Sequence, residues 1–414
     1  MKKHLRTSVA AAIAAGGMSA AMAIDLTENI SFIGFGTAGF ARSNRSEAEF
    51  RPSVFPKRGA DNSGLDFGVD SKLGLQLNGK INSQFSASVQ VLAQRAGETS
   101  NADAISMAFV KWQPNSDLAV RVGRLRWAAF LATESFAVGY ANPWVRPPVD
   151  VYGQVPMYTI DGIDATYQLN WGDNALSIQP MYGTTRFDLP EPFPGAGKVN
   201  GKSSNLVGIN MVLERGPWTV RAGYNRTKLT VSNGMIDSVF NGLRMASATM
   251  PEAGTLADSL EARGSRGQFM GAGVIYSEGN VLLQGEYTLR RTKSFMADTT
   301  GWYGTAGYRF GKVMPYFTLA RLRVDSPVTN NTLPNSGGTA MLAQGVNMLL
   351  ATGNNGQQTA SVGTRYDFAK NMALKVQFDH IRLRGAGSTG FLVNAQPGFG
   401  GPVNVVSAVV DFVF

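Results

Sequence analysis

The most regular feature of the chain is an alternation of apolar and polar residues. In SKLGLQLNGKI, residues 71–81, Leu73 and Leu75 fall on one face and Lys72 falls on the other. The alternation resumes two residues later in QFSASVQVLAQ, residues 84–94. A period of two is typical of β-strands with one apolar and one polar face, and strands joined by so short a link are antiparallel neighbours. The pattern therefore predicts a β-hairpin.

The same unit recurs to the end of the chain and predicts about sixteen strands of around ten residues each. Short turns, such as WGDN at 171–174, alternate with long irregular segments. An even number of antiparallel strands with short turns at one end and long loops at the other is typical of a transmembrane up-and-down β-barrel. We therefore predict an all-β fold of this kind. The predicted strands cover 30–42, 71–81, 84–96, 104–113, 118–126, 157–170, 175–187, 204–214, 218–230, 266–278, 281–294, 301–310, 313–325, 357–369, 372–386 and 403–414.

Aromatic residues distinguish a barrel from a soluble β-sandwich, which would alternate in the same way. Seven large rings lie beside short turns or at the C-terminus, and this arrangement predicts a girdle at one membrane interface. A closed barrel also leaves no exposed sheet edge in lipid. Trp302 would belong to the opposite rim. The predicted girdle residues are Trp112, Trp171, Trp218, Phe310, Tyr316, Phe368 and Phe412.

The first 23 residues predict a secretory signal peptide, which leaves 24–414 as the barrel domain. Lys2, Lys3 and Arg6 precede a stretch of small apolar residues, and AMA at 21–23 fits a cleavage site. Removing these three charges reduces the net charge from +9 to +6.

Composition argues against several kinds of chemistry. The chain has no Cys, and after the signal peptide it has only His380, so disulfides, metal clusters and a hydrolase triad are not favoured. We expect no enzyme activity, no metal and no cofactor. Basic residues scattered singly along strands also do not favour nucleic-acid binding.

The C-terminal segment VSAVVDFVF places Val406, Ala408, Val410, Phe412 and Phe414 on one face and ends the chain there. A terminal Phe in this frame resembles the C-terminal signature of Gram-negative outer-membrane barrels. The whole mature chain resembles the sixteen-stranded trimeric porins of Gram-negative bacteria. This resemblance implies export to the outer membrane, contact with lipid and lipopolysaccharide, and passive diffusion of small hydrophilic solutes and ions. It also implies a homotrimer and recognition of Phe414 by the barrel-assembly machinery.

Four of the eighteen prolines fall within ANPWVRPPVDVYGQVP, residues 141–156. Proline fixes its own φ and favours an extended residue before it, so we expect a rigid arm. In the porins that the chain resembles, the loop after the fifth strand folds into the barrel and narrows it. The loop after the fifth predicted strand here is 127–156, and we expect it to be this constriction loop. An external loop stiffened against proteolysis is the alternative.

The candidate pore-lining residues lie on this loop and on the polar faces of the strands. Alternation places Arg121 on the lumen face, and a bulge or bend at Gly123 would bring Arg124 or Arg126 inward. The other constriction or lumen candidates are Glu134, Arg146, Asp150, Tyr152, Lys72, Lys80, Lys111, Arg221, Arg321, Arg323, Arg365 and Lys375.

The resemblance implies loop carboxylates facing wall arginines, and the basic wall favours a mild preference for anions. We expect Arg146 and Asp150 to be exposed to passing solute. Two simpler interpretations stay open. Lumen arginines can pair with neighbours such as Glu286 or Asp379, and the basic residues can lie on the outer rims, against lipopolysaccharide phosphates.

Two long loops, 235–263 and 339–351, look helical rather than extended. We expect them to pack over the pore mouth, against a neighbouring protomer or onto their own loops. Two other functions also stay open: an eighteen-stranded substrate-specific channel, and a structural or adhesive barrel without transport.

Overall fold

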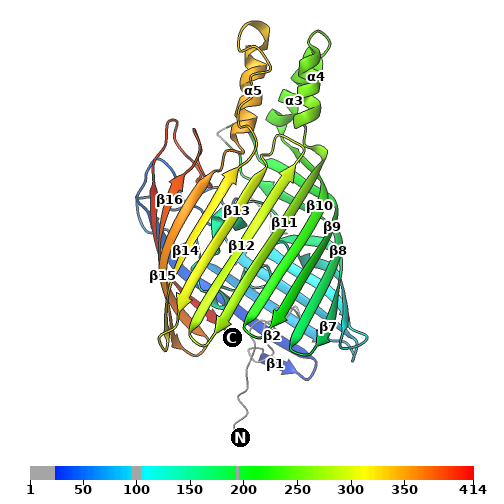
Figure 1. Cartoon of the computed structure of the whole chain (residues 1–414), viewed down its shortest axis with the longest axis vertical. Coiled ribbons are helices and arrows are strands. Elements are labelled where there is room, and N and C mark those ends of the chain that lie inside the picture. The colour runs from blue at the N-terminus through cyan, green and yellow to red at the C-terminus, as the bar shows by residue number, and fades with distance from the viewer. Residues whose placement is uncertain (1–23, 96–103, 193–194) are drawn as a thin grey trace.

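Sixteen antiparallel strands, β2 to β17, form a closed barrel in the computed structural model, which describes residues 24–95, 104–192 and 195–414 (Figure 1). Each predicted strand overlaps one of them, so the predicted all-β barrel is confirmed. The bounds are β2 Ile30–Ser43, β3 Lys72–Lys80, β4 Phe85–Gln94, β5 Ile105–Trp112, β6 Leu118–Arg126, β7 Thr159–Trp171, β8 Asn174–Leu189, β9 Val199–Arg215, β10 Trp218–Ser232, β11 Arg263–Glu278, β12 Val281–Thr292, β13 Thr299–Tyr308, β14 Val313–Val324, β15 Gln357–Ala369, β16 Met372–Leu383 and β17 Val403–Val413.

The last strand closes the barrel against the first. β17 pairs with β2 from Val405↔Ser43 to Val413↔Phe35. The ring of Phe414 lies over Gly34, where a Cβ atom would collide with it. A short strand, β1 (Ile24–Thr27), pairs with the start of β2. The barrel therefore has sixteen strands, and the eighteen-stranded alternative is wrong for the described part of the chain.

The predicted signal peptide, 1–23, lies outside the described residues, as does the last residue of the strand predicted at 84–96.

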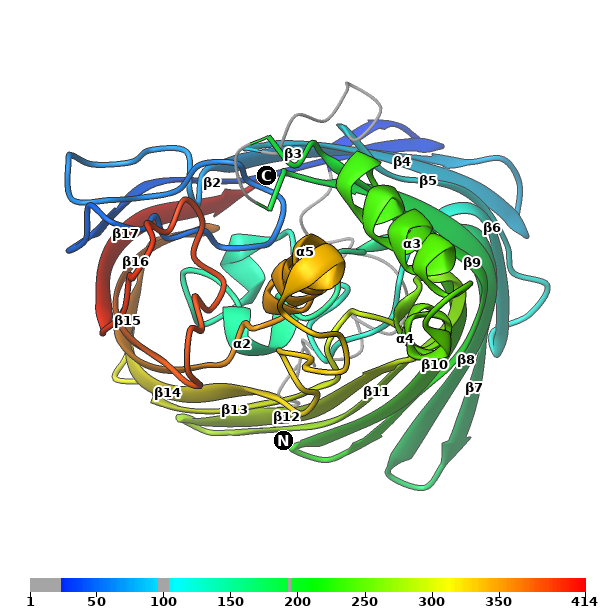
Figure 2. The same cartoon turned by 90° about the horizontal axis from the view of Figure 1, so that it is seen from above.

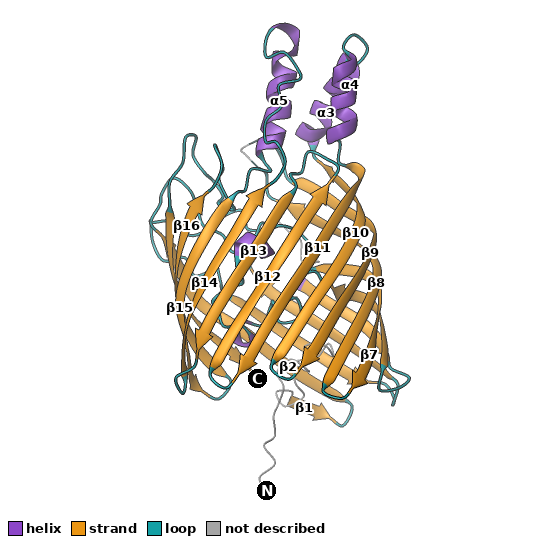
Figure 3. Cartoon of the chain, in the orientation of Figure 1, coloured by secondary structure: helices purple, strands orange, loops and turns teal. Residues whose placement is uncertain are grey.

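Short turns and long loops lie at opposite ends of the barrel (Figure 3). Four of the predicted girdle residues, Trp112, Trp171, Trp218 and Phe310, are exposed at the turn end. Tyr316 is an exception, because its side chain points inward and is buried. Its hydroxyl donates to Gln377 Oε1 at 2.8 Å, inside the barrel.

Both loops predicted to be helical contain helices. They are α3 (Gly234–Ala246), α4 (Pro251–Leu260) and α5 (Ala340–Ala351), which follows a short 3₁₀ turn. All three project beyond the loop end of the barrel (Figure 1). Seen from above, α5 lies over the barrel interior, while α3 and α4 lie over its wall (Figure 2). None of the helices in the described part of the chain is long and apolar enough to cross a bilayer.

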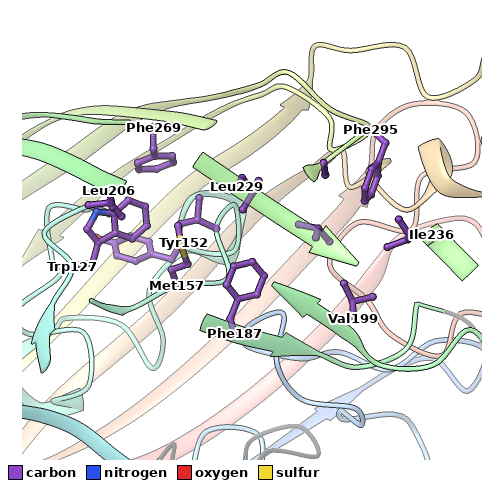
Figure 4. Packing of buried hydrophobic residues seen from close by; sticks show 14 of the residues in the cluster. Trp127, Tyr152, Met157, Phe187, Val199, Leu206, Leu229, Ile236, Phe269 and Phe295 are labelled. Carbon is purple, nitrogen blue, oxygen red and sulfur yellow. The ribbon is translucent and has the colours of Figure 1, made fainter. Parts of the chain in front are cut away.

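The segment between β6 and β7, residues 127–158, lies inside the barrel (Figure 2). It contains a 3₁₀ turn at Gly139–Ala141 and one turn of helix, α2 (Val149–Tyr152). Its apolar residues join a cluster that includes inward-facing residues of β8 to β11 (Figure 4). We call residues 127–158 the internal loop.

Candidate pore lining

The internal loop is held to the wall by a buried ion pair network at Arg146. Its guanidinium donates to both carboxylate oxygens of Asp70, at 2.8 and 2.6 Å, and to Asp379 Oδ2 at 2.7 Å. It also donates to Ser407 and lies 4.8 Å from the ring centroid of Phe50. Burial acts to lower the pKa of Arg146, but the two carboxylates outweigh burial and raise this pKa above its usual value.

Inward-facing cations of β10, β15 and β16 donate to the backbone of the internal loop. Lys375 Nζ donates to Gly139 O at 2.7 Å and to Trp144 O at 2.9 Å. Arg365 donates to Tyr140 O at 2.6 Å, and Arg221 donates to a carbonyl of the loop at 2.7 Å. Irregular backbone inside a barrel needs such partners, because a buried carbonyl without a hydrogen bond is costly. These predicted lumen cations therefore lie behind the loop and anchor it.

Aromatic packing adds to this anchoring. The side chain of Trp144 is 1 % exposed, and its ring centroid lies 5.6 Å from that of Tyr303. Its indole N–H donates to Thr305 Oγ1 at 2.9 Å. Tyr152 stacks on Phe130 at 4.6 Å. Burial raises the pKa of Tyr152 well above its usual value, so the hydroxyl stays protonated.

The expected exposure of Arg146 and Asp150 to passing solute is wrong. Arg146 is 6 % exposed and Asp150 is 1 % exposed. Arg146 is buried because two carboxylates neutralise it, and Asp150 is buried because it lies in the first turn of α2, packed on the wall. Burial raises the pKa of Asp150 to about 6, although hydrogen bonds from Thr359 and Gln357 act to lower it.

The other half of the inner wall, β3 to β9, carries a second charged group that faces the internal loop. On β6, Arg121 pairs with Asp164 of β7 through two hydrogen bonds of 3.0 and 2.6 Å. Arg126 donates to Gln90 Oε1 at 2.7 Å. Glu134, a partly exposed residue of the loop, lies within electrostatic range of both arginines. Burial raises the pKa of Glu134, and the two arginines act to lower it.

Amide and hydroxyl side chains continue this polar surface across neighbouring strands. Gln90 donates to Gln76 Oε1 at 2.8 Å, and Ser106 donates to Gln90 at 2.8 Å. Gln179 donates to Asp164 at 2.8 Å. These residues form two hydrogen-bonded groups on the inner wall, which together we call the polar file. One group consists of Gln76, Gln90, Ser106 and Arg126, and the other consists of Arg121, Asp164 and Gln179.

A cavity of about 310 Å³ lies at the turn end of this wall, and its lining includes Lys80, Lys111 and Arg121. A second cavity, of about 1180 Å³, lies between the internal loop and the short turns and is lined by both acidic and basic residues. Lys72 lies within electrostatic range of Asp70, Asp411, Arg126 and Arg146.

Three predicted lumen residues lie on the outer face instead. The backbone at Gly123 is irregular, with φ of 137°, but only Arg126 turns inward. Arg124 remains outside and pairs with Asp161 at 2.8 Å.

Arg321 and Arg323 share the outer face of β14 with Phe317. The inner face of β14 carries Tyr316 and Leu322 beneath the internal loop. Both faces of the strand are therefore partly apolar, and polarity does not reveal which one points inward.

Sequence reasoning missed two acidic residues that organise these groups, Asp70 and Asp164. The alternation argument could have found Asp164, because it lies between the apolar residues Ile163 and Ala165 and so falls on the opposite face from them. Asp70 lies in a long loop before β3, where no periodicity reports its direction. The suggested pairings with Glu286 and Asp379 are present: Arg221 lies 3.6 Å from Glu286, and Arg146 pairs with Asp379.

No protein-family model matches the chain, and no curated protein matches it in sequence. Solved structures match over nearly its whole length. OmpF of Salmonella typhi, solved in complex with daunomycin, has a TM-score of 0.55 and 15 % identity, covering 95 % of this chain and 100 % of OmpF. The anion-selective porin of Comamonas acidovorans has a TM-score of 0.52 and 14 % identity, covering 93 % of this chain and 99 % of that porin. The outer-membrane channel DcaP of Acinetobacter baumannii has a TM-score of 0.55 and 11 % identity, covering 94 % of this chain and 99 % of DcaP. The fold is therefore that of outer-membrane porins and channels.

Proposed function

We propose that this protein is a porin of a Gram-negative outer membrane, through which small hydrophilic solutes and ions diffuse passively. The solute path runs between the internal loop and the polar file on β3 to β9. The observation that carries the proposal is the closed sixteen-stranded barrel, whose fold matches solved outer-membrane porins and channels over nearly the whole chain. Within this barrel, Glu134 of the internal loop lies within electrostatic range of Arg121 and Arg126 on the wall. Opposed charges across a narrow aqueous passage orient polar solutes and impose charge selectivity.

We further propose that the pore mildly prefers anions. The cavity at the turn end of the path is lined by Lys80, Lys111 and Arg121 and by the carboxylates Asp25 and Glu28, so its cations outnumber its carboxylates. Fixed positive charges along a narrow path raise the local concentration of anions. The internal loop would then act as the constriction, its anchored side fixed by Arg146 and its free side carrying Glu134.

The family resemblance supports three further parts of the proposal. The chain would be exported by its signal peptide, recognised by the barrel-assembly machinery through Phe414, and assembled as a homotrimer in contact with outer-membrane lipid. Chemical cross-linking of detergent-extracted protein would test the trimer.

Single-channel recording in a planar bilayer tests the pore itself. We expect steady ohmic conductance steps, in groups of three for a trimer. A correctly folded barrel that stays electrically silent would instead favour a structural or adhesive role.

Reversal potentials in a salt gradient test the anion preference. We expect Lys111→Gln to reduce the anion-to-cation permeability ratio about five-fold, because a unit charge roughly 8 Å from the ion path in water contributes ~0.5 kcal/mol of opposite sign for anions and for cations. The matched control is Arg321→Gln, which removes one charge from the outer face and should leave the ratio unchanged. Equal effects of both variants would show that the path does not pass the polar file.

A further inference from the structure

The cavity of about 310 Å³ at the turn end of the barrel lies between the inward faces of β2 to β6 and the short strand β1. Its lining combines cations, carboxylates and uncharged polar side chains. The strand register arranges most of these side chains in two adjacent rows that run across the sheet. The chemistry of the two rows defines the kind of solute that fits the cavity.

The row nearer the short turns carries the cations. Lys80 on β3 is the cross-strand partner of Ser86 on β4, and Ser86 is in turn the partner of Lys111 on β5. Lys111 is the partner of Arg121 on β6. Neighbouring strands lie about 4.8 Å apart, so the whole row spans roughly 14 Å. We call Lys80, Ser86, Lys111 and Arg121 the cation row.

The cation row has positive charge that the protein does not neutralise. Lys111 and Arg121 are directly opposed, and like charges in this position destabilise a sheet. Arg121 has a carboxylate partner in Asp164. In the part of the chain that the structure describes, Lys80 and Lys111 form no ion pair, although carboxylates also line the cavity. A bound anion would offset the repulsion between these cations.

The second row lies two residues further from the turns on each strand, and most of it is uncharged. Ser31 on β2 is the cross-strand partner of Asn78, and Asn78 is the partner of Ser88. Ser88 Oγ donates to Asn78 Oδ1 at 2.8 Å, and Asn78 Nδ2 donates to Ser31 Oγ at 3.5 Å. A serine hydroxyl has one donor and two acceptor sites and an asparagine amide has two donors, so the row keeps capacity for a ligand. We call Ser31, Asn78 and Ser88 the hydroxyl–amide row.

Different groups end the hydroxyl–amide row on its two sides. Asp25 of β1 is the cross-strand partner of Ser31 and continues the row with a carboxylate. Phe109 of β5 is the partner of Ser88 and ends the row with an aromatic ring. The guanidinium of Arg121 lies 5.3 Å from the centroid of this ring, so the two rows meet there.

The spacing of the two rows sets the length of a solute that contacts both. Two residues along a strand cover about 7 Å. A carbon chain of about six atoms has roughly this length, since each carbon–carbon bond is about 1.5 Å long. An anionic group at one end of such a chain would contact the cation row. Hydroxyl groups further along it would exchange hydrogen bonds with the hydroxyl–amide row and donate to Asp25.

From this geometry we infer that the cavity binds small organic anions that carry several hydroxyl groups, the chemical class of the sugar acids. An inorganic anion would contact only the cation row, and an uncharged sugar would leave that row without a counter-charge. A hydroxylated organic anion uses both rows at once. The inference rests on the proposed function and deepens it, because it gives the passage a binding site for one class of solute.

Isothermal titration calorimetry of the folded full chain in uncharged detergent micelles tests the ligand class. The probe is sodium gluconate, which has a carboxylate at one end of a hydroxylated carbon chain. We expect gluconate to bind at least ten-fold more tightly than hexanoate, which lacks the hydroxyl groups, and than sorbitol, which lacks the carboxylate. Equal affinity for gluconate and either of these two compounds would overturn the inference.

Two variants assign the two rows, and circular dichroism confirms that each is folded. Lys111→Gln should weaken gluconate binding on the order of ten-fold and leave sorbitol binding unchanged, because hydrogen bonds to charged groups are the stronger ones. Asn78→Ala should weaken gluconate binding about five-fold and leave hexanoate binding unchanged. The matched control is Arg321→Gln, which removes a cation from the outer face and should not alter gluconate binding. Equal losses in Lys111→Gln and Arg321→Gln, or unchanged gluconate binding in Asn78→Ala, would overturn the site.

Single-channel recording with chloride distinguishes a failure of this inference from a failure of the proposed function. We expect gluconate to reduce the chloride conductance of the wild type, and to reduce it less in Asn78→Ala. A barrel that conducts chloride but binds no gluconate would overturn the site and leave the porin proposal standing. An electrically silent barrel that binds gluconate would support the site and overturn the porin proposal.

Discussion

Arg121 on β6 and Arg221 on β10 are both inward-facing arginines with a carboxylate nearby, yet their surroundings differ. Arg221 lies behind the internal loop and donates to Ala128 O at 2.7 Å. Arg121 belongs to the polar file and pairs with Asp164, within electrostatic range of Glu134. The same residue type thus anchors the loop on one half of the wall and lines the proposed solute path on the other half.

The comparison shows that the hydrogen bonds to the loop backbone come from β10 to β16, which we call the covered half of the wall. On the covered half, apolar residues and donors to backbone carbonyls satisfy an irregular chain. On the other half, β3 to β9, polar side chains bond to one another, and the contacts with the loop are apolar.

The largest expected effect comes from removing the anchor on the covered half. Arg146→Ala leaves Asp70 and Asp379 as buried, unpaired carboxylates, and we expect it to destabilise the protein by ~3–5 kcal/mol. Thermal or urea unfolding in detergent micelles measures this change. Adding Asp70→Asn and Asp379→Asn to Arg146→Met should restore much of the stability, because no buried charge then remains. Failure of the triple variant to recover any stability would mean that the charge network is not what holds the loop.

The second effect is a pH dependence of the protein's stability that is caused by Asp150. Its pKa is raised from 3.8 to about 6 in the folded protein, so between about pH 4 and pH 6 the folded state binds more protons than the unfolded state. The stability contributed by the protonated form is therefore lost as pH rises through this window, by an amount on the order of 3 kcal/mol. Asp150→Asn should remove this dependence and leave the variant more stable than the wild type at pH 7. Unfolding temperatures between pH 4 and pH 7 compare the two proteins, and identical pH profiles would contradict the expectation.

The smallest effect separates the two faces of a single strand pair. Arg124→Gln breaks an ion pair on the outer face, where the side chains of Arg124 and Asp161 are 33 % and 52 % exposed, and should cost no more than ~1 kcal/mol. Arg121→Gln leaves Asp164 buried on the inner face and should cost several times as much. Parallel unfolding measurements of the two variants test this order, and an equal loss would show that the faces are assigned incorrectly.

Much of the fold followed from the sequence. Alternation identified all sixteen barrel strands, and the contrast between short turns and long loops identified the two ends. Alternation also placed Arg121 on the inward face. The order of the predicted strands placed the proline-rich segment after the fifth barrel strand. The C-terminal segment predicted as the last strand is β17, and it pairs with β2 to close the barrel.

The positions of several candidate site residues could not be predicted from the sequence. Arg321 and Arg323 were expected inside and lie outside, because the inner face of β14 is apolar beneath the internal loop. Arg146 and Asp150 were expected to meet solute and are buried. For loop residues no periodicity exists, so their contacts depend on how the loop packs.

The sequence by itself determined the strands and the barrel, because a period of two is a local property of each strand and closure follows from the need to pair every edge. Only the tertiary structure decided which cations anchor the internal loop and which belong to the polar file. That division depends on contacts between residues far apart in the chain, such as Asp70, Arg146 and Asp379. Polarity reports the inward face of a strand only where water fills the barrel, and it loses that meaning where the loop packs against the wall.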